Sequence, residues 1–202
     1  MKKTFDLKSL KTFDLRKALS YEALYNMCQR TSKISFKVLN YNKKGLPNEY
    51  SVFYTNVKSI TGINSDKTPM YETNHRLNIK LEAKYPEPPA ICYFETPIWH
   101  PNIKFSGPTK GHVCYNSNDM SSGYKLDELV EFIGLMIQYK NYHAILGQIP
   151  YPEDVEVAKW VTEYAEKEGL VNYKAGRAID NSFLLDPLPG HEPKPLPDID
   201  FY

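Results

Sequence analysis

The chain has 202 residues, of which 42% are hydrophobic and 13% aromatic, enough for one sizeable core, so we expect one domain with extensions. The 25 basic and 24 acidic residues leave a formal net charge of +1, which argues against nucleic acid or an anionic membrane as a partner. No stretch reaches the ~20 apolar residues that span a bilayer, and the N-terminus lacks the apolar core of a signal peptide. These features predict a cytoplasmic protein.

The N-terminal residues predict an arm followed by a helix. Residues 1–19 contain the pentapeptide KTFDL twice, at a spacing that fits no solenoid unit, and are predicted to form a basic, partly helical arm. Ser20 is a suitable N-cap for a helix over residues 21–30, in which Met27 and Cys28 share one face with their apolar neighbours.

The next part of the chain has the two-residue alternation of strands. The strand segments are residues 34–38, 50–60, 76–81 and 90–96. Because the connections are short and sequential strands most often pair with their neighbours, we expect a four-stranded antiparallel meander. Without a basic surplus, the tyrosines and phenylalanines of these strands are better explained as half-buried sheet surface than as a nucleic-acid stacking platform.

Two helices and a tail are predicted after the strands. Residues 125–139 have apolar side chains at three- and four-residue spacing, which should cover one face of the sheet, and residues 153–168 form a second helix that ends at Gly169. The prolines of residues 185–202 favour an extended tail, either an inert linker or a docking peptide. The predicted domains are an arm over 1–19, a catalytic domain over 20–170 and a tail over 171–202.

The most specific stretch, residues 85–116, leads to a cysteine. Prolines and glycines after the strand exclude helix and mark a loop that ends at Cys114. A free cysteine is more often a small buried hydrophobe than a nucleophile. Here, however, the loop also carries His100, Asn102, His112 and Asn116. A thiolate needs neighbours that tolerate charge, and acyl transfer needs hydrogen-bond donors for the oxyanion, so this loop is a candidate active site.

The cysteines otherwise argue against disulfides and metal. Cys28, Cys92 and Cys114 are odd in number and have no Cys-x-x-Cys spacing, so neither a disulfide framework nor a zinc site is predicted, and a reducing compartment fits. The sequence also has no Gly-rich phosphate loop. We expect no cofactor and no metal.

An ordered series of motifs carries a family resemblance. The series is Pro69-Met70-Tyr71, Tyr85-Pro86, Pro88-Pro89, Phe94, Thr96, Ile98, His100-Pro101-Asn102-Ile103, Gly111, Val113 and Cys114. It resembles the core of ubiquitin-conjugating enzymes. The resemblance implies an α+β fold of that family, with the four-stranded meander flanked by helices. It also implies that Cys114 forms a thioester with a ubiquitin-like protein, that Asn102 supports the oxyanion and that His100 holds the loop.

The same resemblance implies the partners of the reaction. An activating, adenylating enzyme would deliver the ubiquitin-like protein to Cys114, and an amine of a target protein would then accept it. No nucleotide or metal need bind, because a thioester already stores the driving force for amide formation.

The sequence also departs from the usual family pattern. Residues 104–110 look like an insertion, the tryptophan usual after the cysteine is missing, and the acidic or serine residue of the loop after the next helix falls near His143. Such divergence resembles bacterial relatives found in antiphage operons, which act on a ubiquitin-like protein or on the C-terminus of a cGAS-like nucleotidyltransferase. His112, Asn116 and His143 are possible supporting residues.

Three other functions remain open from the sequence. Cys114 with His100, His112 or His143 would make a hydrolase that cleaves rather than ligates. The same four residues are of types that bind zinc. A non-catalytic binding module on the same fold is the third possibility, although such modules typically lack the cysteine.

Overall fold

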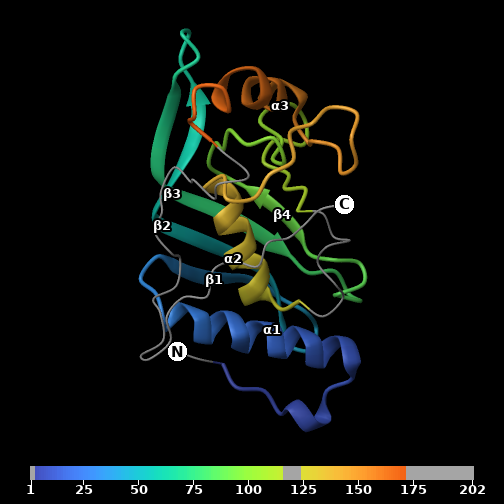
Figure 1. Ribbon diagram of the computed structural model, residues 1–202. Helices are drawn as coiled ribbons and strands as arrows, with labels where there is room; N and C mark the ends of the chain where they lie inside the picture. Colours follow the sequence, from blue (N-terminus) through green and yellow to red (C-terminus); the bar gives the residue numbers. More distant parts are fainter. Residues whose placement is uncertain (1–2, 116–123, 172–202) are drawn as a thin grey trace, which may run out of the picture.

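The computed structural model describes residues 3–115 and 124–171. Its elements are η1 (Leu7–Ser9), α1 (Thr12–Cys28), β1 (Ile34–Tyr41), β2 (Pro47–Ile63), β3 (Pro69–Lys80), β4 (Ile91–Phe94), α2 (Leu126–Ile137), α3 (Val155–Trp160) and the π-helical turn η2 (Val161–Ala165). Figure 1 shows α1 beside β1 at one end and α3 at the other. None of the helices in the described part of the chain combines the length and apolarity needed to cross a membrane.

The four strands form an antiparallel sheet in the order β1-β2-β3-β4, which confirms the predicted meander. The register aligns apolar side chains in rows, because Val52 stands opposite both Phe36 and Leu77, and Leu77 stands opposite Phe94. Such cross-strand pairs are the unit of sheet stabilisation. With the flanking helices this arrangement is the α+β fold that we expected.

The first helix begins earlier than predicted. α1 starts at Thr12, so Ser20 is a buried residue inside the helix rather than its N-cap, and the predicted boundary between arm and domain falls within α1. Residues 12–19 contain no glycine or proline, and the buried residues Ala18, Tyr21 and Leu24 recur every three positions. The buried positions of the helix therefore begin at Lys17 and Ala18, before Ser20, whereas Phe13 in the second KTFDL copy is exposed.

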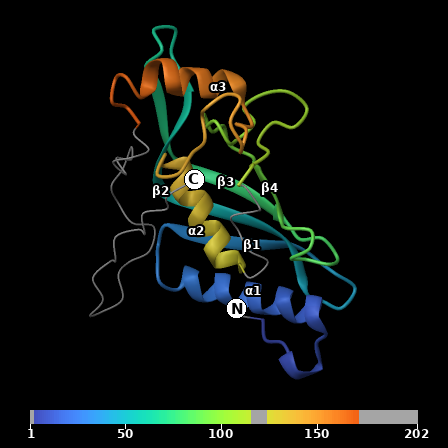
Figure 2. The same cartoon turned by 45° about the vertical axis from the view of Figure 1, so that its right-hand side comes forward.

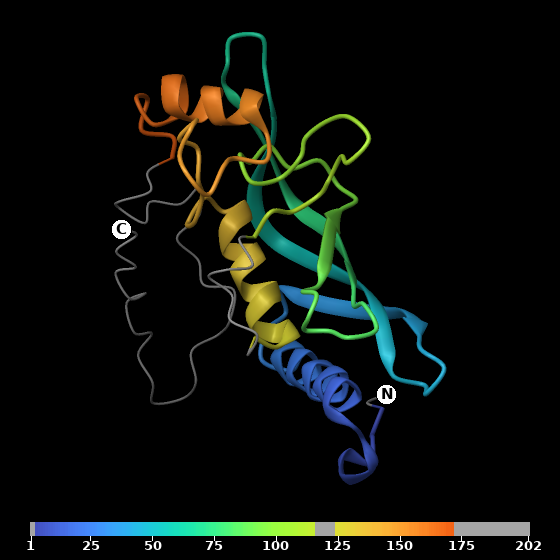
Figure 3. The same ribbon diagram turned by 90° about the vertical axis from the view of Figure 1, so that its right-hand side faces the viewer.

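The helix α2 covers the sheet, as its periodicity predicted. Figure 3 shows it lying on one face of the strands. Its buried side chains are Leu126, Leu129, Val130, Ile133, Met136 and Ile137. One polar contact crosses this interface, where the buried Tyr54 hydroxyl donates a hydrogen bond to the Val130 carbonyl over 2.7 Å.

The predicted last helix is observed as α3 followed directly by η2. Asp154 caps it, since its side chain accepts hydrogen bonds from the N–H groups of Glu156 and Val157. Figure 2 shows α3 beside the far ends of β2 and β3. There the indole N–H of Trp160 donates to the carbonyl of Lys67, at the turn between the two strands, over 3.0 Å. The proline-rich tail over residues 185–202 lies outside the described residues.

Candidate active site around Cys114

Main-chain hydrogen bonds on two sides position Cys114. On one side, the N–H of Val113 donates to the carbonyl of Cys92 in β4 over 3.0 Å. On the other, the N–H of Cys114 itself donates to the carbonyl of Asn102 over 2.9 Å. Val113 is buried while Cys114 is half-buried. The thiol therefore stands at the end of a short extended segment, next to the His-Pro-Asn stretch.

Residues 104–110, which were predicted to be an insertion, leave this arrangement intact. The N–H of Lys104 donates to the carbonyl of His112, and the N–H of Gly111 donates back to the carbonyl of Lys104, so residues 104–112 form a closed loop. Gly111 has a φ of +86°, and a Cβ there would lie 2.1 Å from the carbonyl oxygen of Phe94. Glycine is thus required where the loop meets β4, and the insertion extends outward without separating Asn102 from Cys114.

His100 is enclosed in this region. It is fully buried, its Nδ1 accepts a hydrogen bond from the N–H of Asn102 over 3.2 Å, and its ring packs against Tyr139 with centroids 4.8 Å apart. Burial lowers the pKa of His100 to about 3. The imidazole is therefore neutral at neutral pH and shapes the loop from within.

Asn102 joins the thiol's segment to the loop that follows α2. Its Oδ1 accepts a hydrogen bond from the N–H of His143 over 2.8 Å, and its Nδ2 donates to the carbonyl of His143 over 3.3 Å. Only 2% of Asn102 is exposed. Both polar atoms of this side chain are thus engaged with the main chain of His143, while its own carbonyl holds Cys114.

His112 pairs with a residue that the sequence did not single out. Its Nδ1–H donates to the carboxylate of Glu153 over 2.9 Å, and its ring lies against Tyr93. His143 approaches through its main chain, which is bonded to Asn102. Asn116, the remaining possible supporting residue, lies outside the described residues.

Asp154 is the second residue that sequence reasoning missed. Its N–H donates to the carbonyl of Pro101, and its carboxylate accepts from the N–H of Phe105 over 3.1 Å and lies 3.5 Å from the Lys104 ammonium. Asp154 therefore caps α3 and also bonds the chain before and after Asn102, at Pro101 and Phe105. An aspartate three residues before Val157, the first predicted core residue of the helix, signals the cap. No local pattern signals its contacts across the fold.

The other two cysteines belong to the core. Cys92 is buried in β4, and burial raises its pKa. Cys28 packs against the same core from α1, and burial raises its pKa to about 11. A thiol with a raised pKa is a poor source of thiolate, so neither competes with Cys114 as a nucleophile.

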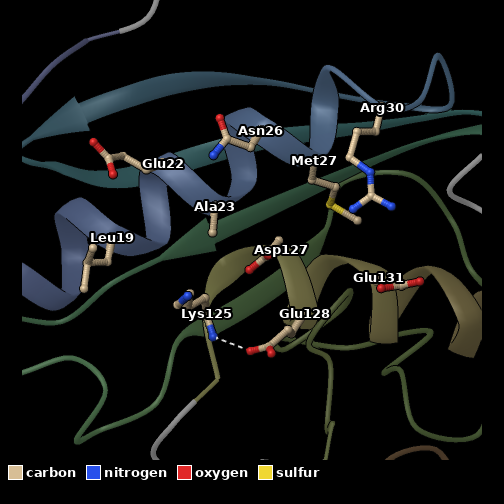
Figure 4. Close-up of a pocket in the computed structure, with 10 residues that line it drawn as sticks. All are labelled: Leu19, Glu22, Ala23, Asn26, Met27, Arg30, Lys125, Asp127, Glu128 and Glu131. Carbon is tan, nitrogen blue, oxygen red and sulfur yellow. Dashed lines mark hydrogen bonds between the residues drawn. The ribbon is translucent and has the colours of Figure 1, made fainter. Parts of the chain in front are cut away.

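Neither a metal cluster nor the groove between α1 and α2 coincides with the thiol. Among residues 3–115 and 124–171, no three His, Cys, Asp or Glu side chains gather closely enough to hold a metal ion, so the alternative zinc site is not assembled. A groove of about 370 Å³ lies between α1 and α2, and its lining, drawn in Figure 4, includes Met27 and Glu131 but none of the candidate site residues.

The fold and this site together define an α+β protein that presents a thiol beside a buried His-Pro-Asn loop. Residues 34–149 match the family model described as ubiquitin-conjugating enzyme. The chain belongs to the ubiquitin-conjugating enzyme family.

Solved structures show the same fold. The E2 domain of a Toxoplasma gondii ubiquitin-conjugating enzyme is similar with a TM-score of 0.51 and 21% identity, covering 75% of this chain and 89% of that one. A Plasmodium yoelii chain assigned to the same class of enzyme has a TM-score of 0.51 and 20% identity, covering 78% of this chain and 89% of that one. No curated protein sequence matches this chain.

Proposed function

We propose that this protein carries a ubiquitin-like protein as a thioester on Cys114 and transfers it to an amine. The observation that carries this proposal is the hydrogen bond from the N–H of Cys114 to the carbonyl of Asn102, which sets the thiol against the His-Pro-Asn loop. In the first step the Cys114 thiolate attacks the carbonyl carbon of a thioester on an activating enzyme, and that enzyme's thiolate leaves. In the second step an amine of a target protein attacks, the carbon–sulfur bond breaks, and the amine loses its proton.

Asn102 and His100 are proposed to serve this reaction differently. His100 is buried and neutral, so its role is to hold the loop. The amide of Asn102 is proposed to support the tetrahedral oxyanion. Since that amide bonds both main-chain atoms of His143, it acts either by turning its N–H toward the oxyanion or by fixing the loop that begins at His143. Both roles make Asn102 more important for aminolysis than for accepting the acyl group.

The geometry removes one histidine from the alternative hydrolase. A general base should carry a pKa near the operating pH. His100 does not, because burial lowers its pKa to about 3. His112 donates its Nδ1–H to Glu153, which leaves Nε2 to take a proton, the orientation that a Cys–His–carboxylate hydrolase uses. His112 is therefore the histidine on which hydrolysis would depend, and we propose His112 and His143 as supporting residues in conjugation.

The pathway is proposed on the sequence alone. The activating enzyme, the modifier and the target follow from family membership in general terms. A bacterial antiphage setting, with either a ubiquitin-like protein or the C-terminus of a cGAS-like nucleotidyltransferase as the acyl donor, stays a prediction based on the divergent motifs. So does a cytoplasmic location. The genes that neighbour this one would test the antiphage setting, and fractionation of the cells that express the protein would test its location.

The experiment that tests the proposed activity is a charging assay. The protein is incubated with ubiquitin, a ubiquitin-activating enzyme and ATP, and in parallel with a small-molecule thioester of the ubiquitin C-terminus, which needs no activating enzyme. We expect an adduct that thiol reductants release and that Cys114→Ala does not form. Multiple turnover on isopeptide-linked substrates without ATP would instead identify a hydrolase.

A further inference from the structure

The loop between α2 and α3 carries the most exposed of the large apolar side chains in the described residues. Ile149 is 81% exposed, Ile145 60% and Tyr151 59%, the three highest values among the exposed large hydrophobic residues of residues 3–115 and 124–171. Leu146 and Val155 are also exposed. Scattered surface hydrophobic residues need no explanation, but a concentration in one segment marks an interaction surface. We call residues 145–151 the apolar loop.

Both ends of the apolar loop are bonded to the segment that holds the thiol. At its start, the main chain of His143 bonds the side chain of Asn102, whose carbonyl accepts from the N–H of Cys114. At its end, the carboxylate of Glu153 accepts from His112, two residues before Cys114. The apolar side chains of the loop are thus displayed at the border of the candidate active site.

We propose that the apolar loop docks the acceptor polypeptide, through apolar side chains that neighbour the lysine to be modified. This inference rests on the proposed function and names the substrate class of its second step. The acyl group arrives covalently bonded to Cys114, whereas the acceptor has no covalent attachment and must be held by surface contacts for its amine to reach the thioester. Holding the amine near the carbonyl contributes directly to the rate.

The charges near the apolar loop agree with a lysine-bearing partner. Residues 145–158 include Glu153, Asp154 and Glu156 and contain no lysine or arginine. Asp154 is buried against Lys104 and Glu153 is bonded to His112, so Glu156 is the exposed carboxylate of this stretch. A partner that brings a cation with apolar neighbours therefore meets both apolar surface and the Glu156 carboxylate.

The test compares two acceptor peptides with the full-length protein. Each peptide contains one lysine, which is flanked by leucine and isoleucine in one peptide and by serines in the other. The protein is charged with ubiquitin, and discharge is measured against free lysine and against each peptide over a range of concentrations. The variants are Ile149→Ser and Tyr151→Ser, and the matched control is Leu39→Ser, which replaces an exposed apolar residue of β1. Melting temperatures are measured for all of them.

We expect the parent and Leu39→Ser to prefer the apolar peptide by roughly tenfold in kcat/KM, the scale of one apolar contact. In Ile149→Ser and Tyr151→Ser this preference should fall, mainly through KM, with charging and discharge to free lysine unchanged. Equal rates on both peptides in the parent, or an unchanged preference in both loop variants, would overturn the inference. So would slower charging or slower discharge to free lysine in the loop variants, because the apolar loop would then serve the modifier. If the parent forms no thioester on Cys114, the proposed function itself is wrong.

Discussion

The two ends of the molecule both contain an apolar cluster but differ in the polar contacts that are added to it. At the sheet end, α1, α2 and β1–β4 enclose one apolar cluster in which Leu24, Val52 and Ile133 are buried. At the thiol end, a second cluster that contains Trp99 and Trp160 is combined with polar contacts between segments distant in sequence. The side chains of Asn102, Asp154 and His112 form these hydrogen bonds. Apolar packing thus shapes both ends, since Val113 and Tyr115 beside the thiol belong to the first cluster, and at the thiol end side-chain hydrogen bonds add to it.

This difference has a consequence for substitutions. A buried apolar side chain that is shortened costs stability in proportion to the cavity it leaves. A hydrogen-bonding residue that is removed leaves its buried partners unsatisfied and frees the segments it joined. We therefore expect polar substitutions at the thiol end to alter both stability and the reaction, and apolar or thiol substitutions at the sheet end to alter only stability.

The largest effect is expected from Asn102→Ala. This variant should accept ubiquitin on Cys114 at a near-normal rate but discharge it to lysine about a hundredfold more slowly, the scale of losing one oxyanion donor. Single-turnover discharge of the preloaded thioester measures this. The matched control is Asn78→Ala, which removes an amide–carboxylate contact within the sheet and should leave both steps unchanged.

Parent-like discharge by Asn102→Ala would show that Asn102 is not the donor. In that case Asn116→Ala and His112→Ala, assayed in the same way, identify the residue that is. If Asn102 acts by fixing the following loop, Asn102→Ala should also speed amide hydrogen exchange in residues 143–153.

Asp154→Ala should produce the largest loss of stability. The substitution removes the cap of α3 and leaves the half-buried N–H of Phe105 without its acceptor, so the free energy of unfolding should fall by about 2 kcal/mol. Urea unfolding measures it. Asp6→Ala provides the control, since Asp6 caps η1 at an exposed site and should cost clearly less. Equal losses in both variants would mean that Asp154 does not hold the two segments together.

The buried His100 should make the free energy of unfolding depend on pH. Because burial lowers the pKa of folded His100 from 6.5 to about 3, the unfolded chain binds a proton at this residue between these values and the folded chain does not. Stability is therefore complete above about pH 6.5 and declines as the pH falls, by roughly 1.4 kcal/mol from this residue at about pH 5.5. His100→Asn should flatten the decline. His75, also buried with a lowered pKa, remains in both proteins, so the difference between the two curves isolates His100.

The smallest effect is expected from Cys92→Ala. Removing this buried sulfur from β4 leaves a small cavity and should cost about 1 kcal/mol of stability, with charging unchanged. Cys28→Ala, on the core-facing side of α1, should behave similarly. Loss of charging in either variant would contradict the assignment of the reaction to the thiol end.

The sequence predicts the parts of the molecule that depend on apolar packing better than the hydrogen bonds between segments distant in the chain. The strands and α2 follow from apolar periodicity, which is a local property of residues such as Val130 and Ile133. The predicted start of α1 is wrong because Ser20 is a suitable cap residue by type, although buried positions of the helix continue before it at Lys17 and Ala18. The partners Glu153 and Asp154 lie about 40 and 50 residues along the chain from His112 and Phe105. Only the folded arrangement brings them together, so no sequence pattern reveals these contacts.

The most direct test of the central claim uses Cys114→Lys, in which an amide replaces the labile thioester. The variant is incubated with ubiquitin, activating enzyme and ATP, treated with reductant, digested and analysed by mass spectrometry. We predict a reductant-resistant adduct in which the ubiquitin C-terminus is joined to the side chain at position 114. Absence of that adduct, together with a reductant-sensitive adduct on Cys28 or Cys92 of the parent, would contradict the account.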